Sequence, residues 1–134
     1  MKNALLLVLL SPAASAAPFI PSSALRYDPT PSALMEDCRS AKTRAESDLR
    51  SLADLPAHSR TFDNTPASLD RIVSELSDET ASDTFLKYVS VSSSVRDAAN
   101  DCETLLGQFA VDVYAREDLY GAVNAYAAKG EALG

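Results

Sequence analysis

Apolar residues recur at three- and four-residue steps over residues 31–55, which is the spacing of one face of an α-helix. Thr30 and Pro31 suit the N-cap and the first helical position, where the missing N–H of proline has no intrahelical partner to lose. Pro56 disfavours helical geometry in the residue before it. The pattern therefore predicts a helix over residues 31–55. Its apolar face consists of Leu34, Cys38, Ala41, Ala45, Leu49 and Leu52.

A second helix is predicted over residues 66–90. Thr65 and Pro66 repeat the opening of the first helix, and neither proline nor glycine occurs within residues 67–106. Ser and Asp are weak helix formers in its middle, but without a breaker we expect one continuous helix rather than two. The residues of its buried face are expected to be Leu69, Ile72, Val73, Leu76, Phe85, Leu86 and Val89.

A third helix is predicted over residues 94–115. Ser94 and Asp97 have the three-residue spacing of a capping box at its start. Gly107 lies within this helix, where the absence of a side chain suits a close helix crossing. The apolar face is expected to consist of Val95, Ala98, Cys102, Leu105, Leu106, Phe109 and Val113.

The last helix is predicted over residues 118–129. Glu117 and Asp118 place negative charge at its positive end, and Gly130 suits its carboxyl terminus. Amphipathic helices joined by short connections predict an all-α fold, an antiparallel array of about four helices within residues 30–134.

Residues 1–16 have the pattern of a secretory signal peptide. Lys2 precedes a short apolar run over residues 4–10, and small residues follow at 14–16. This run is too short to cross a bilayer, which takes about 20 apolar residues. We therefore expect export to the periplasm or the extracellular space, with no stable membrane insertion. Residues 17–29 contain three prolines and are expected to form an extended leader.

The charge of the chain is acidic, with 12 Lys and Arg against 19 Asp and Glu. Removing residues 1–16 removes Lys2, so the remainder has 11 basic and 19 acidic residues and a net charge of −8. Nucleic-acid binding requires a basic face, and this balance argues against it.

Cys38 and Cys102 are the only two cysteines. In an exported protein such a pair is a disulfide candidate, and both residues lie on inward faces of predicted helices. Two buried free thiols are an equally good interpretation, because the sequence does not give the separation of the two side chains.

Residues able to carry out catalysis are few. A zinc hydrolase needs several ligands, yet His58 is the only histidine and lies in a predicted loop. Neither a His-Glu-x-x-His motif nor a glycine-rich phosphate loop nor a Gly-x-Ser-x-Gly elbow occurs. We therefore predict no catalytic residue and no metal ligand in this chain.

The most distinctive segment is the loop formed by Thr61, Phe62, Asp63, Asn64 and Thr65. Asn64 and Thr65 are expected to cap the helix that follows, and Phe62 is expected to staple the turn to an apolar residue beyond it. The loop resembles the Thr-aromatic-acid-Asn-Thr signature of the thimet oligopeptidase, neurolysin and oligopeptidase A family of zinc metallopeptidases. Further similar pieces occur in the family's order, namely Val89-Ser90, Ser94-Val95-Arg96-Asp97-Ala98 and Asp118-Leu119-Tyr120.

The resemblance covers roughly residues 34–126 and implies the amino-terminal helical subdomain of such a peptidase. In that family a His-Glu-x-x-His helix and a later glutamate hold the zinc, far downstream of these helices. The resemblance therefore implies zinc and peptide hydrolysis only in a longer parent, and this chain is expected to be inactive alone. Pro66 departs from the family, which more often has an aliphatic residue there.

Two interpretations follow from the resemblance. The chain is either a partial peptidase, since Gly134 falls where an interhelical loop is expected, or a free-standing exported bundle that binds a peptide or a protein partner. In the first case its partner is the missing catalytic region.

Overall fold

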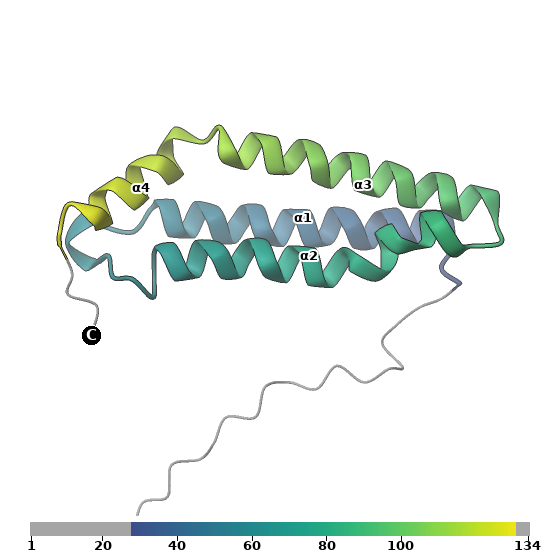
Figure 1. The fold of residues 1–134 in the computed structure, drawn as a ribbon, viewed down its shortest axis with the longest axis horizontal. Helices are drawn as coiled ribbons and strands as arrows, with labels where there is room; N and C mark the ends of the chain where they lie inside the picture. The colour runs from purple at the N-terminus through teal and green to yellow at the C-terminus, as the bar shows by residue number, and fades with distance from the viewer. Residues whose placement is uncertain (1–27, 131–134) are drawn as a thin grey trace, which may run out of the picture.

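The computed structural model describes residues 28–130, which form four α-helices. These are α1 (Pro31–Ala53), α2 (Pro66–Val89), α3 (Ser93–Tyr114) and α4 (Glu117–Ala127), with a short 3₁₀ turn η2 (Ala57–Ser59) between α1 and α2. The first three helices lie side by side as long antiparallel rods (Figure 1). The predicted all-α array is confirmed, and no strand occurs in the described part of the chain.

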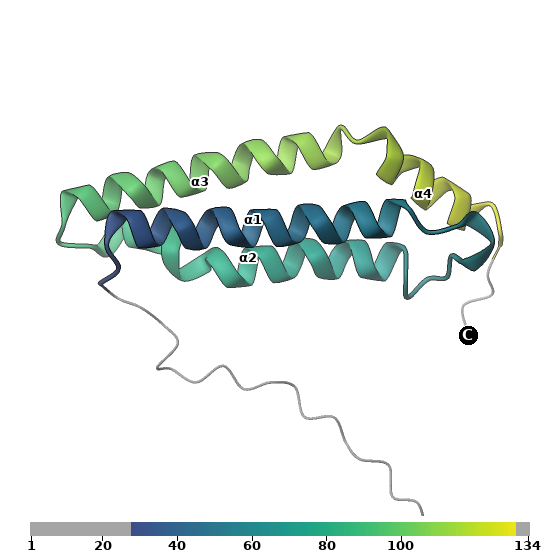
Figure 2. The ribbon, with the colours of Figure 1, turned by 180° about the vertical axis from the view of Figure 1, so that it is seen from behind.

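The short helix α4 leaves the line of α3 at a bend. It crosses the end of α1 and reaches η2, as the view from behind also shows (Figure 2). The observed ends of the four helices differ from the predicted ranges by at most two residues. The expected signal peptide and nearly all of the expected leader lie outside the described residues.

The core of the bundle consists of two hydrophobic clusters, one at each end. The first cluster surrounds the α2–α3 turn, and its members are Leu34, Cys38, Leu86, Val95, Ala98, Ala99 and Cys102. The second lies where α4 covers α1, and its members are Ala45, Leu49, Leu52, Ile72, Phe109, Leu119 and Ala122. The helical spacing of α1 supplies both clusters from one face.

The expected buried face of α2 is partly wrong. Val73, Phe85 and Val89 are about half exposed, whereas Thr80 and Asp83 are buried. The Thr80 hydroxyl donates to the carbonyl of Leu76 at 2.8 Å, which satisfies it inside the bundle. The side of α2 that faces α1 and α3 is therefore not its most apolar side. As a result, α2 leaves apolar side chains at the surface.

The expected capping box of the third helix is also wrong. Helix α3 begins one residue earlier, with Ser92 as N-cap, and no side chain caps it. Arg96 instead turns back and donates from Nη1 to the carbonyl of Ser90 at 2.8 Å. The Ser92 and Ser94 hydroxyls lie 3.0 Å apart and bond to each other rather than to the helix.

Gly107 does not mark a close helix crossing. It is exposed, and a Cβ built on it meets nothing within 4 Å. A glycine inside a helix costs about 1 kcal/mol relative to alanine because of its backbone entropy. We therefore expect Gly107→Ala to raise the free energy of unfolding by about 1 kcal/mol in urea denaturation. A loss of stability would mean that another part of the protein packs on this position.

Candidate functional site

Asn64 organises the loop formed by residues 61–65. Its Oδ1 accepts from the backbone N–H of Thr61 at 2.8 Å and from the Thr65 hydroxyl at 2.9 Å. Its Nδ2 donates to the carbonyl of Ser59 at 2.9 Å, and its backbone N–H donates to the Thr61 hydroxyl at 3.2 Å. One side chain thus closes the turn on itself and ties it to η2.

The expected roles of Thr65 and Phe62 need correction. Thr65 is the N-cap residue of α2, but its φ of −124° and ψ of −82° are not the extended geometry of a capping residue, and its hydroxyl turns to Asn64. Backbone groups serve the first turn instead, since Ala67 N–H donates to the carbonyl of Phe62 at 3.0 Å. The ring of Phe62 lies against Tyr126 of α4, with ring centroids 6.5 Å apart. Phe62 therefore packs on a different helix from the α2 that follows the loop. The side chain of Asp63 is exposed.

Removing the Asn64 side chain should loosen this loop. We expect Asn64→Ala to lower the free energy of unfolding by about 2 kcal/mol, because the part-buried Thr61 N–H and Thr65 hydroxyl lose their acceptor. Asp63→Ala, in the same turn but exposed, should change it by less than about 0.5 kcal/mol. Both can be measured by urea denaturation. Equal effects would show that Asn64 does not hold the turn.

Arg60, which precedes this loop, is buried although it carries a charge. Its Nη1 donates to the carbonyl of Leu52 at 3.1 Å, and its Nη2 donates to those of Ala53 and Leu55 at 2.8 and 2.7 Å. These carbonyls belong to the end of α1 and the residues after it, where the helix cannot satisfy them. Arg60 therefore caps α1 from the chain that follows it.

Lys129 joins α4 to the same region. Its Nζ donates to the carbonyl of His58 at 3.1 Å and also to that of Arg60. His58 itself lies exposed in η2, with its side chain at the surface. Sequence reasoning missed Arg60 and Lys129, because a long cationic side chain in a loop has the same pattern whether it turns inward or points into solvent.

The disulfide was one of two alternatives that the sequence left open, and the structure contains it. Cys38 of α1 and Cys102 of α3 are bonded, with Cα atoms 5.9 Å apart and both side chains fully buried. The bond joins the helices through the first hydrophobic cluster.

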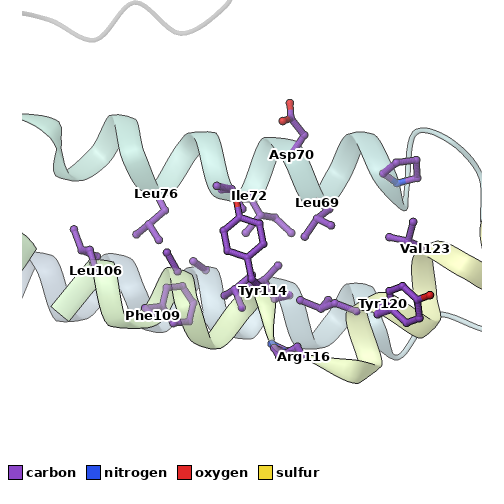
Figure 3. A pocket seen from close by; sticks show the side chains of 17 residues that line it. Leu69, Asp70, Ile72, Leu76, Leu106, Phe109, Tyr114, Arg116, Tyr120 and Val123 are labelled. Carbon is purple, nitrogen blue, oxygen red and sulfur yellow. The ribbon is translucent and has the colours of Figure 1, made fainter. Parts of the chain in front are cut away.

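An open apolar groove of about 540 Å³ lies at the opposite end of the bundle. Helix α2 forms one side, the end of α3 and the start of α4 form the other, and α1 forms the floor (Figure 3). Most of its lining is apolar, including Leu69, Ile72, Val73, Leu76, Leu106, Phe109, Val113, Leu119 and Val123. The sequence did not predict this groove, since its lining comes from four helices that are separated along the chain.

Two tyrosines extend the groove to the surface. Tyr114 and Tyr120 line it and are 90% and 72% exposed. Arg116 lines it as well, but its guanidinium donates from Nε and Nη2 to Asp118 at 2.9 and 2.6 Å. Asp70 occupies the α2 side, and Figure 3 shows its carboxylate pointing away from the cavity.

The ion pair of Arg116 and Asp118 predicts a pH effect. Hydrogen bonding from Arg116 lowers the pKa of Asp118 to about 2. Because the unfolded chain has the higher pKa, the pair stabilises the fold above about pH 4, and this contribution disappears as the pH falls towards 2. An NMR titration should find the Asp118 midpoint near pH 2, and Arg116→Gln should move it upward. An unmoved midpoint would show that Arg116 is not the cause.

Metal-ligating residues do not gather in the described structure. Across residues 28–130 no group of three or more His, Cys, Asp or Glu side chains could hold a metal ion. None of the described helices is long and apolar enough to span a membrane. The described residues offer a hydrogen-bonded loop, a disulfide and an apolar groove.

Comparison with known proteins links the chain to a peptidase. The chain is 35% identical over 74 residues to a thimet-like oligopeptidase of Dictyostelium discoideum. The match covers 55% of this chain but only 11% of that relative's length. No protein-family model and no solved structure matches the chain. The similarity supports at most a distant relationship to the thimet-like oligopeptidases.

Proposed function

We propose that this chain is the amino-terminal helical portion of an exported thimet-oligopeptidase-like zinc metallopeptidase and is not catalytic by itself. The observation that carries the proposal is the 35% identity to a thimet-like oligopeptidase, of which the match covers 11%. Peptide hydrolysis and the zinc that supports it belong, in this proposal, to the longer parent.

The geometry supports this assignment of roles. The loop of residues 61–65, which carries the family resemblance, uses its side chains to close the turn before α2, to tie it to η2 and to contact α4. Such a loop needs no substrate or metal to explain its composition. A structural role for the loop fits helices that build the wall of a larger enzyme.

Export is also part of the proposal. A disulfide such as Cys38–Cys102 forms and persists in oxidising compartments, which include the periplasm and the extracellular space. The apolar run at residues 4–10 supplies the signal for export. Cell fractionation should find the protein outside the cytoplasm with no free thiol. Recovery from the cytoplasm with both thiols reduced would contradict this part.

The transcript that encodes the chain tests the relationship to a peptidase. We expect the reading frame around codon 134 to continue, in the mature transcript, into further helical sequence and a His-Glu-x-x-His motif. A stop codon followed by unrelated sequence would overturn the proposal.

A second candidate is a free-standing exported bundle that binds a peptide or a protein partner. The open groove beside α2 favours it, because an apolar surface of this kind is typical of interaction sites. A cooperative unfolding transition of the isolated monomer, together with the stop codon described above, would support this candidate.

A further inference from the structure

We draw no further inference here: the strongest candidate, the open apolar groove between α2 and the junction of α3 with α4, is an unpartnered face, and nothing in the described part of the chain shows what covers it.

Discussion

Replacing both Cys38 and Cys102 by alanine is expected to lower the free energy of unfolding by about 4 kcal/mol. The disulfide closes a loop with a sequence separation of 64 residues, and the cross-link removes many conformations from the unfolded chain. Part of the loss will reflect packing, because both side chains are fully buried in the first hydrophobic cluster. Urea denaturation of the oxidised protein and of the variant measures the difference.

The reduced wild-type protein separates these two contributions. It keeps both sulfur atoms in the core, so its loss of stability reports the cross-link without the alanine cavities. The m-value, which is the slope of the free energy of unfolding against urea concentration, should increase in both the reduced protein and the variant. The reason is that an unlinked chain exposes more surface when it unfolds. A loss below about 1 kcal/mol on reduction would contradict a stabilising role for the bond.

Replacing Arg60 by methionine is expected to lower the free energy of unfolding by about 3 kcal/mol. Methionine keeps the long apolar part of the side chain but removes the guanidinium, which donates to the carbonyls of Leu52, Ala53 and Leu55. Hydrogen bonds from a charged group are stronger than neutral ones. The substitution also takes this donor away from buried and part-buried carbonyls at the end of α1. The effect should therefore exceed that of an ordinary surface substitution.

Arg50→Met is the matched control for Arg60→Met. Arg50 lies in the last turn of α1, with an exposed side chain and a distant ion pair to Glu46 at 3.7 Å. Its replacement should change the free energy of unfolding by less than about 0.5 kcal/mol. Hydrogen exchange should quicken at residues 54–65 in the Arg60 variant only. Similar effects of the two substitutions would show that Arg60 does not cap the helix.

The predictable parts of this fold are those set by local spacing. The apolar face of α1 follows directly from residues at three- and four-residue steps, and all six of its expected members are buried. The two cysteines were placed on inward faces of their helices by the same reasoning. For α2 the spacing failed at Val73, because the helix has apolar side chains on more than one side and its neighbours decide which are covered.

The candidate site was predictable only in part. Residues 61–65 stood out as a motif, but the roles of Thr65 and Phe62 depend on backbone angles and on the position of Tyr126, which local sequence does not specify. The groove is lined by residues of all four helices. Its shape is set by how these helices pack on one another, and so the pattern of residues gave no sign of it.

The central claim, that these helices belong to a larger peptidase, is tested most directly on the native protein. An antibody raised against residues 28–130 should isolate it from its source for mass spectrometry and for an assay with a fluorogenic peptide. We predict a protein much larger than the 14.3 kDa of this chain that cleaves the peptide and loses activity with a zinc chelator. A protein of 14.3 kDa or less without peptidase activity would contradict the claim.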